Sequence, residues 1–311
     1  MSMSTNLLLD SYIKKVKQHG FIGMINMLGN LIKQFSFRIK SKALILIAKI
    51  SYKECYVIKE VQGSNMLLNL NDVGISQELF FYGVHESEST KQYKKTLQSG
   101  MTVFELGANI GYYALIGAKI VGPNGRIIAF EPSPVNMRAF KTNVTLNNLE
   151  DIVDLYQRGV GAKTGKMQFN LVNKGNMSSF YNRSNGGGIK TLESIEVDVI
   201  SIDDFFENKQ IKIDYMRMDV EGYEYEIFQG MTKFLKTEYA PTGFFIEVHS
   251  QLLNNNGHSC REFVMILKNF GYDIVSARWR GKKEQLVTST LMLLEHPLCE
   301  QGYWEAFFKK I

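Results

Sequence analysis

The sequence predicts an α/β protein with a Rossmann-like, doubly wound sheet that is mostly parallel, has seven strands and is covered by helices. From Met101 onward, short apolar segments alternate with amphipathic ones. Residues 103–113 read Val-Phe-Glu-Leu-Gly-Ala-Asn-Ile-Gly-Tyr-Tyr, which is typical of a buried strand, a glycine turn and the start of a helix. Twenty residues after Gly111, the segment 129–132 (Ala-Phe-Glu-Pro) predicts a second buried strand that ends on a carboxylate, Glu131.

Before this sheet, residues 1–78 are expected to form an extension of helices and a small β unit. Apolar residues recur at helical spacing within residues 1–50. Residues 52–82 alternate in places and contain a glycine turn, which predicts two antiparallel strands. We therefore place the main domain at residues 79–311.

Within the main domain, a polar segment at 87–98 predicts a helix. The seven strands of the sheet are predicted at 102–106, 126–130, 152–156, 214–218, 243–248, 272–277 and 290–294. Residues 167–199, between the third and fourth of these strands, predict additional β structure with a surface loop at 184–188.

The net charge of +5 is concentrated at the start of the chain. Residues 1–60 hold ten Lys and Arg against three Asp and Glu, an excess of +7. With its apolar residues at helical spacing, this stretch is compatible with a helix on an anionic membrane surface, a helix that holds a partner, or a solvated helical face. Basic and aromatic residues are not interleaved as in nucleic-acid-binding modules, so no nucleic-acid partner is expected.

The cellular compartment is indicated by the cysteines and by the apolar runs. Cys55, Cys260 and Cys299 are too few and too widely spaced for a disulfide framework or a zinc site, which favours a reducing compartment. The apolar run 43–48 is too short to cross a bilayer, and no export signal is recognised. We expect a cytoplasmic protein, with contact to a membrane surface as an open alternative.

Two adenosine-containing cofactors, NAD and S-adenosylmethionine, fit a glycine turn followed by a strand that ends on an acid. The dinucleotide fingerprint has glycine at three fixed positions, but here Asn109 replaces the middle glycine and Gly111 comes one position early. Glu105 would repel a pyrophosphate, whereas it could pair with a ligand ammonium. These features favour S-adenosylmethionine. A turn with no ligand is the alternative, and Glu131, placed to accept hydrogen bonds from ribose hydroxyls, disfavours it.

With these elements placed, the chain resembles the FkbM-type family of S-adenosylmethionine-dependent methyltransferases. The resemblance covers about residues 79–250. It rests on six ordered motifs, at 104–111, 129–134, 143 with 147, 201–205, 218–224 and 245–249. The resemblance implies a class I methyltransferase sheet and methyl transfer, typically to hydroxyls of sugars, of glycan- or lipid-linked acceptors or of secondary metabolites. The chain departs from the family where Glu105 stands for the usual Asp, and where Met-Arg-Met at 216–218 replaces a common Lys-Ile pair.

The candidate cofactor residues follow the first three predicted strands. They are Glu105, Gly107, Asn109, Gly111, Glu131, Pro132, Arg158, Gly159 and Val160. The last three follow the third strand, where this fold commonly contacts adenine.

Four ionisable residues follow the next two strands and are candidates for catalysis. Asp219 and Glu221 end the fourth strand, while Glu247 and His249 end the fifth. Because ligands of such sheets lie beyond the carboxyl ends of the strands, these groups could deprotonate an acceptor hydroxyl. Alternatively, Asp219 and Glu247 could hold Mg²⁺ or a similar hard cation. Helix capping is the structural alternative for Asp219.

Two other functions stay open at this point. One is a protein that binds S-adenosylmethionine or a partner without catalysis. The other is a nucleic-acid methyltransferase, which the absence of an Asn/Asp-Pro-Pro-aromatic signature after the fourth strand disfavours. His85 and His258 are expected to be structural.

Overall fold

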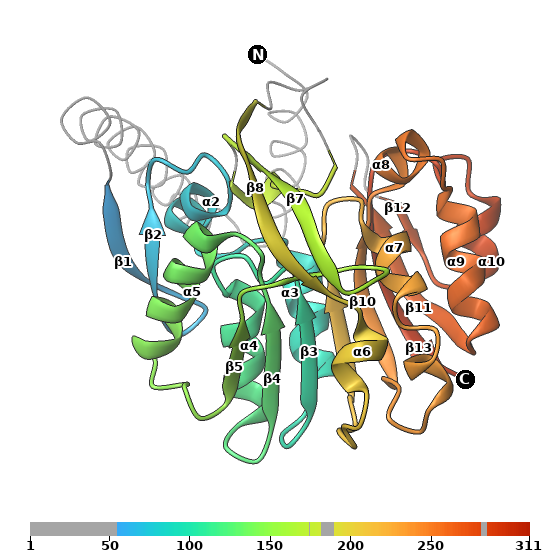
Figure 1. Cartoon of the computed structure of the whole chain (residues 1–311), viewed down its shortest axis with the longest axis horizontal. Coiled ribbons are helices and arrows are strands. Elements are labelled where there is room, and N and C mark those ends of the chain that lie inside the picture. The colour runs from blue at the N-terminus through green and yellow to red at the C-terminus, as the bar shows by residue number, and fades with distance from the viewer. Residues whose placement is uncertain (1–54, 174, 182–189, 281–284) are drawn as a thin grey trace, which may run out of the picture. The chain divides into compact units, whose positions relative to one another are not determined.

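The structure is a computed structural model that describes residues 55–173, 175–181, 190–280 and 285–311 (Figure 1). The helices predicted within residues 1–50 and the loop predicted at 184–188 lie outside the described residues. The chain divides into two compact units, Met1–Cys55 and Tyr56–Ile311, and the description below concerns the second.

The central sheet of this unit has eight strands in the order β12-β11-β13-β10-β9-β3-β4-β5. Their bounds are β3 (Thr102–Leu106), β4 (Arg126–Phe130), β5 (Val153–Tyr156), β9 (Tyr215–Met218), β10 (Gly243–Val248), β11 (Tyr272–Trp279), β12 (Gln285–Val287) and β13 (Trp304–Lys310). From β5 to β10 each neighbouring pair is parallel, whereas β13 runs antiparallel to both β10 and β11. The predicted α/β class and mostly parallel sheet are therefore confirmed.

The last strand of the sheet lies elsewhere than predicted. The segment predicted as the seventh strand, 290–294, is the helix α10 (Thr290–Glu295), and β13 takes the place of that strand. The hydroxyl of Ser289 accepts a hydrogen bond from the N–H of Met292 and caps this helix. The short β12 is an additional edge strand, so the sheet has eight strands where seven were predicted.

The sheet is buried on both faces, because alternate residues of its central strands enter two different cores. Phe104 and Met216 belong to one core, and Val103 and Tyr215 belong to the other. The helices that contribute to the first core are α6 (Ile202–Phe206), α7 (Glu224–Gln229), α8 (Ser250–Asn255), α9 (Cys260–Asn269) and α10. Those of the second core are α2 (Ile75–Tyr82), α3 (Ser87–Thr96), α4 (Tyr112–Val121) and α5 (Pro134–Thr145).

Two smaller sheets complete the unit. The hairpin of β1 (Tyr56–Val61) and β2 (Ser64–Asn69) confirms the β unit expected within 52–82, and its apolar residues enter the second core. The boundary predicted between residues 78 and 79 stays a prediction.

The second small sheet, called here the arm, confirms the additional β structure expected within 167–199. It consists of β6 (Gly159–Val160), β7 (Gly165–Val172) and β8 (Thr191–Ile200), and the one-turn helix η1 (Gly175–Met177) follows β7. The arm lies over the carboxyl ends of the central strands (Figure 1).

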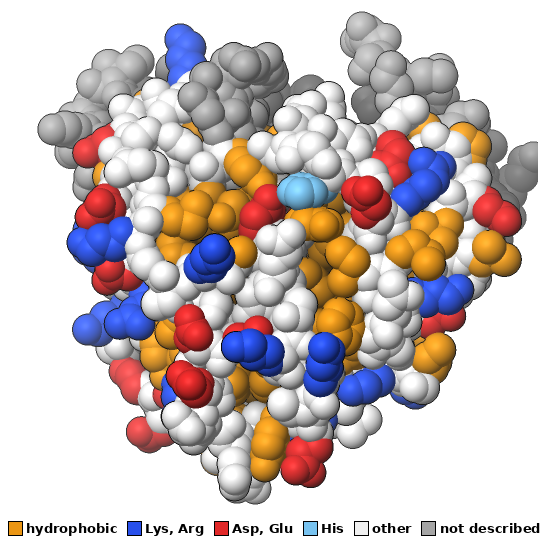
Figure 2. Space-filling view, turned by 45° about the vertical axis from the view of Figure 1, so that its right-hand side comes forward, with side chains coloured by type: hydrophobic (Ala, Val, Ile, Leu, Met, Phe, Trp, Pro, Cys, Tyr) orange, Lys and Arg blue, Asp and Glu red, His pale blue; other side chains and the backbone are white. Residues whose placement is uncertain are grey.

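The surface and the helix lengths bear on possible partners. Figure 2 shows one face of the molecule, on which Lys and Arg side chains are interspersed with Asp and Glu among hydrophobic patches. The described part of this face carries no continuous basic patch. Among the helices of the described residues, none combines the length and apolar character needed to cross a bilayer.

Candidate functional site

The glycine turn begins where β3 ends, and its backbone requires glycine. Gly107 has a φ of +76°, and a Cβ atom there would lie 1.9 Å from the carbonyl oxygen of Asp219. The backbone N–H groups of Gly107 and Ala108 both donate to the carbonyl oxygen of Phe130, each at 3.0 Å. The turn is thereby fixed to the end of β4 on one side and to the segment after β9 on the other.

Glu131 lies directly after β4 and is part of the same hydrogen-bonded unit. One carboxylate oxygen accepts from the backbone N–H of Asn109 at 2.8 Å, and the other accepts from the N–H of Ser133 at 2.9 Å. Burial raises the pKa of Glu131 to about 7, although these two N–H groups act to lower it. The carboxyl group is therefore positioned by backbone hydrogen bonds, and its pKa lies near neutral pH.

The turn and Glu131 border a cavity, called here the turn cavity. Seven of the nine predicted cofactor residues line it, namely Gly107, Asn109, Glu131, Pro132, Arg158, Gly159 and Val160. Two further walls, which the sequence reasoning did not find, are Phe169 of β7 and Phe180, which follows η1. The cavity has a volume of about 50 Å³. Its carboxyl group and apolar walls are of the kinds that ribose hydroxyls and a base require, as expected from the sequence.

The remaining two predicted cofactor residues do not line the turn cavity. At Gly111, φ is +89° and a Cβ atom would lie 2.2 Å from the ring of Phe140, so this glycine is needed for packing of α4 against α5. Glu105 is fully buried, and its Oε1 accepts a hydrogen bond from Nη1 of Arg217 at 2.7 Å. The prediction that Glu105 offers its carboxylate to the cofactor therefore does not match this placement, because Arg217 already holds it.

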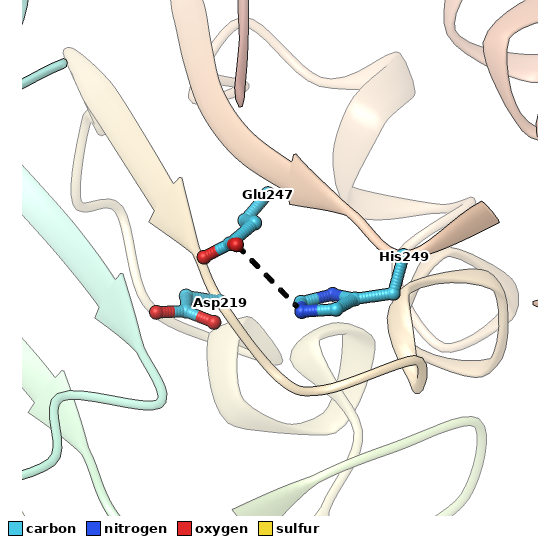
Figure 3. Close-up of side chains that lie close together, drawn as sticks. All are labelled: Asp219, Glu247 and His249. Carbon is cyan, nitrogen blue, oxygen red and sulfur yellow. Dashed lines mark ion pairs between the residues drawn. The ribbon is translucent and has the colours of Figure 1, made fainter. Parts of the chain in front are cut away.

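All four predicted catalytic residues line a second cavity of about 200 Å³, called here the acidic cavity. It meets the turn cavity at residues that line both, among them Gly107, Asn109, Asp219 and Glu221. Asp219 follows β9 and Glu247 ends β10, so the parallel pairing of these strands brings them to one edge of the sheet. In Figure 3 the side chains of Asp219, Glu247 and His249 point toward one another.

His249 is oriented by a buried carboxylate. Its Nδ1 lies 2.7 Å from Oε1 of Glu224, the first residue of α7. Its Nε2 faces the cavity, at 3.3 Å from Glu221 and 3.9 Å from Glu247. A histidine held through one ring nitrogen presents the other at a fixed place, as catalytic and metal-binding histidines do.

The pKa of Glu247 and the pKa of His249 are both raised in the acidic cavity, for different physical reasons. Burial raises the pKa of Glu247 well above its usual range, and the nearby carboxylates of Glu86 and Asp219 raise it further. Burial acts to lower the pKa of His249, but the carboxylates of Glu221 and Glu224 outweigh it, so the pKa is raised well above its usual value.

Further charged groups border the acidic cavity and were not predicted from sequence. Nη1 of Arg280 lies 2.9 Å from Glu86 and 3.5 Å from Glu247. His85, which was expected to be structural, also lines this cavity and lies 3.0 Å from Glu86. Arg280 and the residues 85–86 are far apart in sequence, so only the tertiary fold brings them together.

Three of these groups have the composition of a site for a divalent cation. One ligand atom each of Asp219, Glu247 and His249 lie within 4.8 Å of one another. The two carboxylates are ligands that Mg²⁺ or Mn²⁺ prefers, whereas the imidazole suits a transition metal better than Mg²⁺. The contact between Glu224 and Nδ1 of His249 is the usual support of a metal-binding histidine.

Comparison with known proteins shows which family the chain belongs to. Residues 105–274 match the model of the family described as the Methyltransferase FkbM domain. Methyltransferase 1 of Beauveria bassiana (strain ARSEF 2860) is 27% identical over 146 residues, which cover 42% of this chain and 57% of that protein. Methyltransferase sdnD of Sordaria araneosa is 24% identical over 196 residues, covering 50% of this chain and 74% of its own. The chain thus spans just over half the length of the first of these relatives.

Solved structures that resemble the chain include an S-adenosylmethionine-dependent O-methyltransferase from Thermotoga maritima. It has a TM-score of 0.38 and 13% identity, and the match covers 73% of this chain and 66% of that one. A precorrin-6y C5,15-methyltransferase from Geobacter metallireducens has a TM-score of 0.39 and 15% identity, with coverage of 73% and 90%. An rRNA methylase from Streptococcus thermophilus has a TM-score of 0.41 and 10% identity, with coverage of 72% and 95%.

Proposed function

Because the chain belongs to the FkbM family of S-adenosylmethionine-dependent methyltransferases, we propose that it methylates a hydroxyl group of its acceptor. The acceptor is a sugar, a glycan- or lipid-linked molecule or a secondary metabolite. The observation that carries the proposal is the junction of the turn cavity with the acidic cavity, at Gly107, Asn109, Asp219 and Glu221. A cofactor in the first cavity would thus lie next to an acceptor in the second.

The transfer itself is an in-line displacement at the methyl carbon of the sulfonium. The acceptor oxygen forms the new bond to carbon, the carbon–sulfur bond breaks, and its electron pair stays on sulfur to give S-adenosylhomocysteine. Correct placement of the two reactants supplies much of the rate. The hydroxyl proton must also leave, and in this proposal Glu247 accepts it, with His249 beside it at 3.9 Å to balance the charge.

A second form of the proposal uses a divalent cation held by Asp219, Glu247 and His249. Its support is the 4.8 Å grouping of their ligand atoms. A bound Mg²⁺ would lower the pKa of the acceptor hydroxyl. A chelator separates the two forms, because only the second loses activity when divalent cations are removed and regains it when they are restored.

Methylation of a nucleic-acid base is the rival activity. Enzymes that grip a flipped base commonly have prolines directly after the fourth strand, whereas this chain has Asp-Val-Glu-Gly at 219–222. The interspersed charges on the face in Figure 2 also give no support for a phosphate-binding surface there. Residues 1–54 lie outside the described residues, so this comparison concerns residues 55–311 only.

The proposal is tested by incubating the full chain with S-adenosylmethionine and a panel of acceptors, and measuring S-adenosylhomocysteine by mass spectrometry. The panel contains sugars, nucleotide sugars, lipid-linked glycans, polyketide alcohols and bulk tRNA. With the acceptor found, Glu247→Gln should slow turnover by at least about a hundredfold. Glu150→Gln, an exposed carboxylate on the surface, is the matched control. Methylation of tRNA alone, or wild-type turnover by Glu247→Gln, would contradict the proposal.

A further inference from the structure

The cofactor brings a charged group that needs a partner in the protein. S-adenosylmethionine carries an α-ammonium on its methionyl part, next to the sulfonium. Glu105, two residues before the first glycine of the turn, is the carboxylate expected to receive it. Another carboxylate, Asp219, lines the turn cavity, whereas Glu105 does not.

Glu105 is closed to any ligand. Its side chain has no exposed surface, and it lines neither the turn cavity nor the acidic cavity. Glu105 and Arg217 are direct partners on the paired strands β3 and β9, and Nη1 of Arg217 lies 2.7 Å from Oε1. Its other oxygen, Oε2, is buried and has no hydrogen-bond partner among the described residues. An ammonium could reach Glu105 only after the guanidinium of Arg217 had moved.

Asp219 has the access that Glu105 lacks. Its side chain is 21% exposed and lines both cavities at their junction. Its backbone N–H donates to the carbonyl of Leu106 at 3.1 Å, and its own carbonyl oxygen fills the space where a Cβ of Gly107 would be. Asp219 therefore lies against the glycine turn itself.

Arg217 fixes the way in which this carboxylate faces the ligand. Nη2 of Arg217 lies 2.9 Å from Oδ2 of Asp219, while Oδ1 has no hydrogen-bond partner among the described residues. The guanidinium is buried, and its carbon lies 4.0 Å from the centre of the Tyr113 ring, so it has a fixed place. The guanidinium of Arg217 thus pairs with both carboxylates, the inaccessible one of Glu105 and the accessible one of Asp219.

We propose that Asp219, through Oδ1, binds the α-ammonium of S-adenosylmethionine, and that Glu105 and Arg217 are positioning residues that orient Asp219. The inference needs only the cofactor, which the family provides, and is independent of the acceptor. Because one oxygen cannot serve both an ammonium and a divalent cation, it assigns Asp219 to the cofactor. Glu247 and His249 are then left to act on the acceptor.

The test compares two ligands by calorimetry with the full chain. S-adenosylhomocysteine carries the ammonium, whereas 5′-methylthioadenosine lacks the whole amino-acid part. Asp219→Asn should weaken S-adenosylhomocysteine binding roughly tenfold to hundredfold, as expected for a charged hydrogen bond, and leave 5′-methylthioadenosine binding unchanged. Glu105→Gln should weaken S-adenosylhomocysteine binding less than Asp219→Asn does, because Glu105 acts on the ligand only through Arg217, and it should leave 5′-methylthioadenosine binding unchanged. A larger loss of S-adenosylhomocysteine binding in Glu105→Gln than in Asp219→Asn would overturn the assignment.

Two further variants keep the result interpretable. Asp214→Asn is the matched control, since Asp214 immediately precedes β9, at the opposite end of this strand from Asp219, and accepts from the N–H of Thr102 at 2.7 Å. It should alter neither affinity.

Asp219→Glu keeps the negative charge. A smaller loss of S-adenosylhomocysteine affinity than in Asp219→Asn supports the charged contact, even if Asp219→Asn folds poorly. An equal loss of both ligands in every Asp219 variant would refute the proposal by showing a general disturbance of the turn. Since no acceptor is present, these outcomes are independent of the turnover of Glu247→Gln.

Discussion

Glu131 and Glu105 are buried carboxyl groups at the ends of neighbouring strands, but they differ in their partners and in their access to a ligand. Burial raises the pKa of each to about 7. The partners of Glu105 are inside the protein, where Arg217 holds it, whereas Glu131 borders the turn cavity with backbone N–H groups as its partners. Of the two, Glu131 is the group whose ionisation a ligand can change.

From this we predict a pH dependence of cofactor binding. Ribose hydroxyls donate to the ionised carboxylate, so S-adenosylhomocysteine should bind Glu131 more strongly once the proton is lost. With a pKa of about 7 in the free protein, affinity should rise about tenfold between pH 6 and pH 8. Calorimetry at these two pH values checks it. Glu131→Gln should bind more weakly at both and lack this rise, and a rise of equal size in the variant would place the titrating group elsewhere.

The same group affects stability with the opposite sign. Its pKa in the folded protein lies above the ordinary value of 4.5, so the folded state binds the proton more tightly than the unfolded chain. The stability that this gives is complete below pH 4.5 and is lost as the pH rises through about 7. In the ligand-free protein, the unfolding free energy of the wild type should therefore fall relative to that of Glu131→Gln as the pH rises over this range. Urea unfolding of both proteins can measure this difference.

At the residue level, the sequence could place the acidic groups because each of them lies at the end of a strand or just after it. The parallel strands of an α/β sheet end at one edge, and Asp219, Glu247 and His249 accordingly line one cavity. What the sequence could not show is the register between strands. Only the pairing of β3 with β9 puts Arg217 beside Glu105, and this contact decides which carboxylate a ligand can reach.

At the level of elements, the glycine turn allows a prediction that separates backbone strain from lack of space. Gly107→Ala meets both problems, because φ is +76° and the new Cβ would overlap the carbonyl oxygen of Asp219. Gly257 also has a positive φ, of +83°, but has no atom within 4 Å of its Cβ position. Gly257→Ala should therefore cost only about 1–2 kcal/mol of unfolding free energy, the price of the left-handed conformation alone.

Gly107→Ala should exceed that cost and should also weaken S-adenosylhomocysteine binding, since the turn must shift away from Asp219. Urea unfolding and calorimetry on the two variants measure the effects. Equal destabilisation with unchanged binding in both would mean that the contact between the turn and Asp219 is not tight.

The elements also show where sequence patterns are ambiguous. The strands 102–106 and 243–248 were predicted at their observed bounds, because both are mainly apolar runs between turns, as buried parallel strands are, with one glutamate in each. The run 290–294 is mainly apolar too but forms a helix. In so short an apolar run, the periodicity of the side chains cannot distinguish a helix from a strand. Its Ser289 cap was the available signal. The true last strand, β13, carries charged residues at 305, 309 and 310, which hid it.

At the scale of the whole molecule, the two compact units predict that cofactor binding is separable from the basic N-terminal region. Every described residue that lines the turn cavity or the acidic cavity lies within Tyr56–Ile311. The excess of +7 charges lies within residues 1–60, and only the last of these belong to that unit. We expect the N-terminal region to affect location or assembly and to leave the cofactor site unchanged.

A chain that starts at Tyr56 tests this, because the cut keeps the whole β1–β2 hairpin, whose Val61, Met66 and Leu68 are buried in the core. Its affinity for S-adenosylhomocysteine should equal that of the full chain. If the N-terminal region contacts a membrane surface, only the full chain should sediment with anionic vesicles, and this binding should fall with added salt, because charge attraction is screened over about 10 Å at 0.1 M. A folded Tyr56–Ile311 chain that no longer bound S-adenosylhomocysteine would place part of the cofactor site within residues 1–55.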